Sequence, residues 1–257
     1  MFLICEDNPK FEESGKLIAA ANELGIKTFS DVVGQDCLDW YFNSQSTDST
    51  QFTYGTRPFY HKNGWRSDMF CRQDYLYNYS FLMSFSSREL FSISPQIIPA
   101  RNVGLGIFPN QQYFVRPNSG EKTFPGQVIS GRTLQNGLSS LFHIDPWELV
   151  IRAEARKTPD KEYRFFFIRN NSTCTCYECC QYLPEQTNEV PEEIKEWTES
   201  QAERLFDFIP FGNSFVLDVC ELDDVFYLLE INSWNSSSFY SINPKSILRN
   251  ILWSLDV

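Results

Sequence analysis

Three oxygen-bearing side chains near the C-terminal end of the chain could bind a metal ion together. Glu230 and Asn232 are two residues apart, so on a β-strand their side chains lie on the same face. Asp218 lies on the preceding predicted strand and shares that face only if the turn between them has an odd number of residues. Carboxylate and amide oxygens among apolar residues suit Mg²⁺, which shares such ligands with phosphate. The same spacing also fits exposed polar positions on an edge hairpin.

Three cations precede these residues, and the first two could bind phosphate. Arg116 ends an apolar segment, a Pro-Asn-Ser-Gly turn follows, and Lys122 comes after that turn. An arginine fork and a lysine point charge can both hold a phosphate across such a loop. Arg164 precedes three phenylalanines, so it could face a cleft or extend from a sheet edge. Arg116 and Lys122 also fit solvated surface cations beside a turn.

A cluster of cysteines offers a second kind of chemistry. Four of the eight cysteines in the chain fall within one short segment, as Cys174, Cys176, Cys179 and Cys180. Four thiolates could hold a structural zinc ion. The spacing is tighter than in zinc sites built from two separated cysteine pairs, so a cysteine-rich strand or turn is the favoured interpretation.

Charge and hydropathy exclude several classes of partner. The net charge of −11 argues against a broad surface for DNA or RNA, although a small basic pocket for a nucleotide stays compatible with it. No segment approaches the roughly 18 apolar residues of a membrane-spanning helix. The N-terminal residues lack the pattern of a secretory signal. We therefore expect a cytoplasmic protein with reduced thiols and no membrane partner.

The first 30 residues predict a parallel α/β unit. Residues 2–5 form a short apolar run, and residues 11–24 carry apolar side chains at helical spacing. Gly25 is placed to end that helix, and residues 26–29 resemble a second strand. A strand, a helix and a strand at these lengths are typical of α/β domains.

The second half of the chain predicts mainly strands. We expect strands at residues 112–116, 122–129, 149–151 and 163–169, a hairpin of residues 215–221 and 225–232, and helices at 132–141, 190–206 and 246–255. The helix at 190–206 has the clearest start, because Pro191 lies in its first turn and two glutamates follow.

The order of these motifs resembles that of ATP-grasp enzymes, and most closely the clade named for two arginines and one lysine. The motifs are Phe-Val-Arg-Pro (114–117), Lys-Thr-Phe-Pro-Gly (122–126), Glu-Tyr-Arg (162–164), Leu-Asp-Val (217–219) and Glu-Ile-Asn (230–232), followed by Ser236, Ser237, Ser238 and Tyr240. The resemblance covers residues 112–243, and Tyr-Gly-Thr at 54–56 resembles the preceding domain only loosely. Each motif is short, but all five occur in the family's order.

The resemblance implies a fold and a division into domains. The fold is an α/β (α+β) ATP-grasp fold in which two α+β subdomains hold the nucleotide between them. The implied boundaries are 1–108 for a small N-terminal α/β domain that precedes the ATP-grasp domain, and 109–257 for the ATP-grasp domain.

The resemblance also implies roles for the residues above. Arg116 takes the place of a phosphate-binding lysine, Lys122 belongs to the loop over the phosphates, and Arg164 contacts the γ-phosphate or an acyl-phosphate. Asp218, Glu230 and Asn232 hold magnesium. Backbone groups of one strand contact adenine, namely Val150, Ile151, Arg152, Ala153 and Glu154.

The implied reaction is an ATP- and magnesium-dependent ligation of a carboxylate to an amine through an acyl-phosphate. The expected partners are ATP and a peptide, protein or amino-acid-like substrate. The alternative is a catalytically silent nucleotide-binding or interaction module with the same fold. A nucleic-acid ligase is disfavoured because the chain is acidic and lacks a Lys-x-Asp-Gly signature. The chain departs from the family at Arg152, where a small or polar residue is expected, and at Ser237 and Ser238, where Ser-Gly is common.

Overall fold

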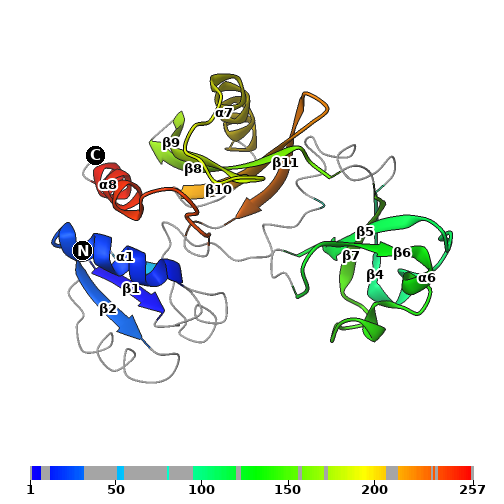
Figure 1. The fold of residues 1–257 in the computed structure, drawn as a ribbon. Coiled ribbons are helices and arrows are strands. Elements are labelled where there is room, and N and C mark those ends of the chain that lie inside the picture. Colours follow the sequence, from blue (N-terminus) through cyan, green and yellow to red (C-terminus); the bar gives the residue numbers. More distant parts are fainter. Residues whose placement is uncertain are drawn as a thin grey trace. The chain divides into compact units, whose positions relative to one another are not determined.

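The computed structural model describes residues 2–6, 12–31, 51–54, 80, 95–119, 123–155, 158–170, 173–206, 214–232, 234 and 237–255 (Figure 1). The chain divides into two compact units, each built from separate stretches of sequence. The first unit comprises Met1–Arg72, Tyr163–Leu217 and Asn232–Val257, and the second comprises Gln73–Glu162 and Asp218–Ile231. Compactness does not decide where a functional domain begins, so the boundary between residues 108 and 109 stays a prediction.

The N-terminal strands form a small parallel sheet beside one helix. β1 (Phe2–Glu6) pairs in parallel with β2 (Lys27–Asp31) and β3 (Gln51–Tyr54), in the order β2-β1-β3. α1 (Glu12–Glu23) connects β1 to β2, and Gly25 follows it with a φ of 69°. The predicted α/β unit is therefore confirmed.

A four-stranded sheet carries most of the predicted site motifs. Its strand order is β11-β10-β8-β9. Its bounds are β8 Lys161–Asn170, β9 Thr173–Leu183, β10 Ser214–Leu222 and β11 Val225–Asn232. Between β9 and β10 the chain forms α7 (Glu192–Phe206), which begins directly after Pro191, two residues later than predicted. The cysteine-rich segment is thus a strand.

The core of the first unit joins segments from both ends of the sequence. Leu17 and Ala21 of α1 pack with Ile247 and Ile251 of α8 (Pro244–Leu255), all four almost completely buried. Phe166 of β8 belongs to the same apolar cluster. Burial of these side chains accounts for the packing of α1 and α8 against each other and on this core.

A second four-stranded sheet lies in the other unit and is antiparallel at each of its strand pairs. Its order is β4-β7-β5-β6, and a separate apolar core packs on it. The bounds are β4 Gln96–Pro99, β5 Gln112–Pro117, β6 Gln127–Ser130 and β7 Leu149–Glu154. The strand predicted at 122–129 is shorter than expected, and Lys122 lies outside the described residues.

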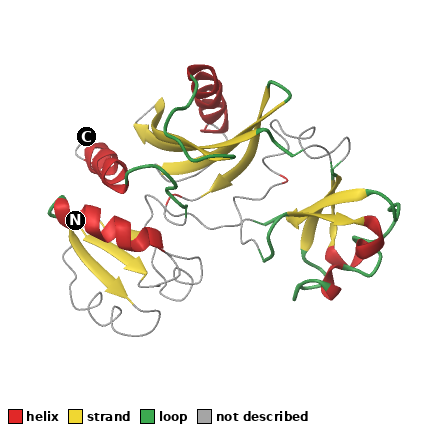
Figure 2. Ribbon diagram, viewed as in Figure 1, coloured by secondary structure: helices red, strands yellow, loops and turns green. Residues whose placement is uncertain are grey.

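The helix predicted at 132–141 is wrong. The chain instead forms the short helix α6 (Gly131–Leu134), which Ser130 caps, and then the 3₁₀ turn η3 (Leu138–Ser140). Gly137 interrupts the helix with a φ of 81°, in the left-handed region that glycine tolerates. Another short 3₁₀ segment, η2 (Ala100–Asn102), follows β4. Figure 2 shows how strands outweigh helices in the described chain, in which no helix is long and apolar enough to cross a membrane.

Candidate functional site

The turn between β10 and β11 decides how the three predicted metal ligands face. Asp223 and Asp224 form a two-residue turn, and both have positive φ, at 50° and 62°. A regular ladder from this turn places Asp218 opposite Leu229, and therefore on the other face from Glu230. The condition for a shared face, an odd-numbered turn, is thus not met.

The packing of the hairpin agrees with this register. Cys220 and Leu222 of β10 pack with Leu229 and Tyr227 of β11 in one small cluster. Residues at alternate positions share a face, so Asp218 lies on the face of Cys220. A third ligand position for Asp218 beside Glu230 therefore requires a bulge that shifts one strand by a residue.

The three side chains are nonetheless sheltered from solvent. Asp218 is 3% exposed and Asn232 5%, and the Glu230 side chain is 19% exposed. Sheltered carboxylates are costly unless positive charge or hydrogen-bond donors compensate them. These residues are therefore not exposed polar positions on an edge hairpin, which was the other interpretation of their spacing.

Arg116 provides positive charge beside Glu230. Its Nη1 lies 3.9 Å from Oε2 of Glu230, and the Arg116 side chain is only 11% exposed. Its Nε also donates a hydrogen bond of 3.4 Å to the carbonyl of Pro117. The structure therefore brings the predicted phosphate-binding cation next to a predicted metal ligand, although 114 residues separate them in the sequence.

Arg164 is buried and anchors the loop that follows β11. It is 6% exposed, and its Nη1 donates a hydrogen bond of 3.0 Å to the carbonyl of Ser238. Its guanidinium lies 4.9 Å from the ring centroid of Tyr240 and 5.7 Å from that of Tyr182. The centroids of the two stacked rings are 4.6 Å apart, so the guanidinium of Arg164 lies beside a pair of stacked aromatic rings. Arg164 thus faces the protein interior and does not extend from a sheet edge.

Arg152 has a structural role. Its Nη1 donates hydrogen bonds to the carbonyls of Val103 (2.5 Å) and Leu105 (2.6 Å), and its Nη2 donates to the Gln96 side chain. Burial lowers the pKa of the Arg152 guanidinium. These contacts hold the segment after β4 and account for an arginine where the family resemblance predicts a small or polar residue.

The backbone of β7 has little capacity to bind a ligand over most of its length. β4 pairs with residues Leu149 to Arg152 along one edge, and β5 pairs with Val150 to Glu154 along the other. The backbone groups of Val150, Ile151 and Arg152 therefore bond within the sheet, which does not favour adenine contacts there.

Glu154 is the exception within the predicted adenine strand. The N–H of Ala155 donates to the carbonyl of Gln112 on β5, so the alternation directs the backbone groups of Glu154 toward the β4 edge. β4 begins at Gln96, which pairs with Arg152, so β4 has no described residue opposite Glu154. The backbone groups of Ala153 point toward β5. Of the five residues, Glu154 therefore has the backbone groups that are best placed to contact adenine.

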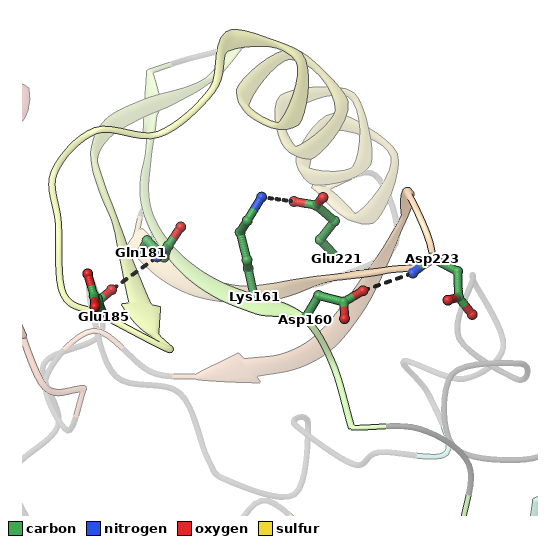
Figure 3. A network of polar contacts seen from close by, with 6 residues as sticks. All are labelled: Asp160, Lys161, Gln181, Glu185, Glu221 and Asp223. Atoms are coloured by element: carbon green, nitrogen blue, oxygen red, sulfur yellow. Dashed lines mark hydrogen bonds and ion pairs between the residues drawn. The ribbon is translucent and has the colours of Figure 1, made fainter.

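A polar network that the sequence did not predict holds the hairpin tip (Figure 3). The Asp160 carboxylate accepts a 3.1 Å hydrogen bond from the N–H of Asp223 in the turn. Lys161 Nζ forms a 3.1 Å ion pair with Oε2 of Glu221 on β10. The pairs span 63 and 60 residues, so no local sequence signal could have revealed them.

The cysteine cluster does not form the zinc site considered above. Within the described ranges, no three side chains of His, Cys, Asp or Glu come together as a metal site would require. All four cysteines lie on β9, with Cys174 and Cys180 buried and Cys176 and Cys179 partly exposed. The strand interpretation is the one that the structure supports.

Comparison with known families assigns the fold. The model of one protein family, the third family of ATP-grasp domains in the clade named for two arginines and one lysine, matches residues 40–251. The chain belongs to this ATP-grasp family. The family predicted from the motif order is confirmed, and the matched residues include all the candidate site residues. No curated protein matches the chain.

Solved structures confirm the ATP-grasp fold. D-alanine–D-alanine ligase from Bacillus anthracis in complex with ATP has a TM-score of 0.61 at 12% identity, covering 99% of this chain and 96% of that one. Phosphoribosylamine–glycine ligase from Thermotoga maritima has a TM-score of 0.67 at 9% identity, covering 100% and 75%. N5-carboxyaminoimidazole synthetase from Staphylococcus aureus has 0.58 at 11%, covering 95% and 75%. The predicted enzyme class, an ATP-grasp ligase, agrees with the family and with these names.

Proposed function

We propose that this ATP-grasp domain is an ATP- and Mg²⁺-dependent ligase that joins a carboxylate to an amine through an acyl-phosphate. The observation that carries the proposal is the sheltered pair of Arg116 and Glu230. A guanidinium fork suits a phosphate, and a carboxylate beside it suits the metal ion that accompanies that phosphate. The family membership and the three ligase structures support the same reaction class.

The nucleotide in this proposal is bound by groups of three segments. Arg116 holds a phosphate, Lys122 belongs to the loop over the phosphates, and the backbone of Glu154 contacts adenine. Arg164 either contacts the transferred phosphoryl group directly or positions the loop at Ser238 that meets the acceptor. Catalysis of this kind depends on positioning and on charge stabilisation, and it requires no nucleophilic side chain.

The proposed metal ligands are Glu230, Asn232 and Asp218. Their hard oxygen donors fit Mg²⁺, and they are sheltered as ligands should be. Glu230 and Asn232 share a face of β11, and a place for Asp218 as the third ligand requires a bulge in the hairpin. When bound, Mg²⁺ would neutralise phosphate charge and polarise the bond to the transferred phosphoryl group.

The acceptor in this proposal is a peptide, a protein or an amino-acid-like molecule, and the reaction takes place in the cytoplasm. The three similar structures act, by their names, on D-alanine, on phosphoribosylamine with glycine, and in carboxyaminoimidazole synthesis. Small carboxylates and amines are therefore the first candidates to test.

The test is ADP and phosphate release from ATP with Mg²⁺, measured over a panel of amino acids and short peptides. Wild-type protein should release ADP and phosphate only when a suitable carboxylate and amine are present. Glu230→Gln should reduce this release at least about a hundredfold, because it removes a charged metal ligand. Glu192→Gln on the exposed side of α7 is the matched control and should keep full activity.

Two outcomes would contradict the proposal in different ways. ATP binding without turnover on any acceptor in the panel would favour the silent nucleotide-binding module. Equal turnover by wild type and by Glu230→Gln would show that Glu230 is not a metal ligand, although the ligase reaction itself would still be supported.

A further inference from the structure

Arg164 and Tyr182 project from the same face of their sheet, on strands that are neighbours. Phe166 of β8 belongs to the apolar cluster of the first unit, so Arg164, two residues before it, projects toward the same side. On β9, Cys180 belongs to that cluster, and Tyr182 shares its face for the same reason. β8 and β9 are adjacent in the sheet, and the guanidinium carbon of Arg164 lies 5.7 Å from the ring centroid of Tyr182. Tyr182 is thus a neighbour of Arg164 that no sequence motif indicated.

The loop after β11 adds a second tyrosine ring. Phe239 of this loop is 1% exposed and packs against Phe166, with ring centroids 6.2 Å apart. The N–H of Ile242 donates a 2.9 Å hydrogen bond to the carbonyl of Phe239, which closes a turn with Tyr240 at its second position. The ring of Tyr240 stacks on that of Tyr182 with an angle of 9° between their planes. The loop therefore holds the two tyrosines, hereafter the tyrosine pair, against each other.

The backbone of Tyr240 is strained. Its φ of 52° lies in the left-handed region, which glycine and asparagine occupy at lower cost than tyrosine. Residues held in this way persist only where the surrounding structure stabilises them, and they occur most often at functional sites. A glycine or an asparagine would complete the same turn with less strain, but neither would place an aromatic ring 4.9 Å from the guanidinium carbon of Arg164. The strain therefore indicates a role for the ring.

Three contacts fix the guanidinium of Arg164. Both rings of the tyrosine pair lie within the roughly 6 Å over which an aromatic face attracts a cation. The third contact is the 3.0 Å hydrogen bond that Nη1 donates to the carbonyl of Ser238. Arg164 is 6% exposed, and the attraction between a cation and a ring is stronger where water is excluded. A cation that is oriented in advance stabilises developing charge without a cost of reorganisation.

We propose that Tyr182 is a positioning residue of the ligase and that, together with Tyr240, it holds the Arg164 guanidinium in the orientation that phosphoryl transfer requires. The inference rests on the role in the ligase reaction proposed above for Arg164. The tyrosine pair acts through Arg164 and makes no contact with ATP, which Arg116 and Glu154 bind in that proposal. Loss of a ring should therefore lower kcat and leave the affinity for ATP unchanged.

The first test is the NMR signal of the Nε–H group of Arg164 in isotopically labelled protein, identified as the arginine signal that Arg164→Lys lacks. The ring current of a nearby aromatic side chain shifts such a signal, so Tyr182→Leu should move it, whereas Tyr182→Phe keeps the ring and should leave it in place. Tyr177→Leu is the matched control, because Tyr177 lies on the same strand and its ring packs against Phe166. An unmoved signal in Tyr182→Leu, or an equal shift in Tyr177→Leu, would overturn the proposal.

The second test is steady-state turnover of ATP with Mg²⁺ over the panel of amino acids and short peptides. Tyr182→Leu should lower kcat at least about tenfold, because a small displacement of a charged group sharply weakens its effect on the transition state. Tyr182→Phe should keep kcat within about twofold, since its ring also attracts a cation. The Kd for ATP, measured by isothermal titration, should be the same in all three proteins. A wild-type kcat in Tyr182→Leu, an equal loss in Tyr182→Phe, or weakened ATP binding in either would contradict the positioning role.

Tyr240→Asn tests the second ring of the pair. Asparagine tolerates the left-handed backbone, so the turn should form, and urea unfolding of each variant identifies any folding defect. This variant should lose kcat as Tyr182→Leu does, and the double variant should lose little more than either single variant, because both rings act through one guanidinium. Losses that multiply in the double variant would show that the two tyrosines act separately.

Failure of this inference is distinguishable from failure of the proposed function. If wild-type protein turns over ATP with no acceptor of the panel, the proposed ligase reaction fails, and the role of the tyrosine pair in it fails as well. If wild-type protein is active and Tyr182→Leu is equally active, the ligase reaction stands and the tyrosine pair has no part in it.

Discussion

At the residue scale, Arg116 is the cation with the most direct test. Arg116→Ala should weaken ATP binding about tenfold or more, because charge-assisted hydrogen bonds contribute about 1.5–3 kcal/mol each. Isothermal titration with ATP and Mg²⁺ measures this change. Arg132→Ala, an exposed arginine of the same unit, is the control. Unchanged affinity in Arg116→Ala would show that this arginine does not bind the nucleotide.

Asp218 tests whether the hairpin carries a bulge. If Asp218 is the third metal ligand, Asp218→Asn should abolish Mg²⁺-dependent ATP turnover as completely as Glu230→Gln does. The expected result is such a loss with an unchanged circular dichroism spectrum, because Asn keeps the size of the side chain. Turnover close to wild type would mean that the regular ladder holds and that Asp218 faces away from the metal.

The sequence identified which residues belong to the candidate site better than it identified the directions in which their side chains point. It singled out Arg116 and Glu230, and the structure brings them within 3.9 Å. It did not predict that the side chain of Arg152, a residue of the predicted adenine-binding strand, donates hydrogen bonds to the carbonyls of Val103 and Leu105. A motif records which residues occur, whereas the direction of a side chain depends on partners almost 50 residues away.

At the scale of elements, the local patterns that define strands and caps were reliable. The parallel unit of β1, α1 and β2 and the helices α7 and α8 lie within a few residues of their predicted positions. The helix predicted at 132–141 failed because tertiary contacts override helix propensity there. Gly131 packs so closely on Phe108 that a Cβ would lie 2.0 Å from its carbonyl oxygen, and Gly137 then breaks the turn.

The β10–β11 turn offers a prediction at this scale. Asp224 has a φ of 62°, a conformation that glycine adopts at lower cost than aspartate. Asp224→Gly should therefore stabilise the protein by about 0.5–1 kcal/mol, measured as a higher urea midpoint. Asp224→Val, which is β-branched, should lower the midpoint instead. A lower midpoint in the glycine variant would show that the Asp224 side chain stabilises the turn.

At the scale of the whole molecule, each compact unit is assembled from separate stretches of the sequence. The stretch Asp218–Ile231 belongs to the second unit, while the residues on both sides of it belong to the first. Asp218 and Glu230 therefore lie close to the two ends of this stretch, where the chain passes from one unit to the other. Local periodicity cannot predict such an arrangement, because it arises from contacts between residues far apart in sequence.

Ligand binding at the proposed site should raise the thermal stability of the protein. A non-hydrolysable ATP analogue with Mg²⁺ at about 100 times its Kd should add about 2.7 kcal/mol to the free energy of unfolding. For a chain of this size, that corresponds to a rise in Tm of about 5–10 °C. Chelation of Mg²⁺ should remove most of the rise, since the phosphates and the carboxylates would then repel each other. In Glu230→Gln, the rise in Tm caused by the analogue should depend little on Mg²⁺, because this variant has lost the charged ligand at position 230. A shift that is the same with and without Mg²⁺ in wild-type protein would place the metal away from these residues.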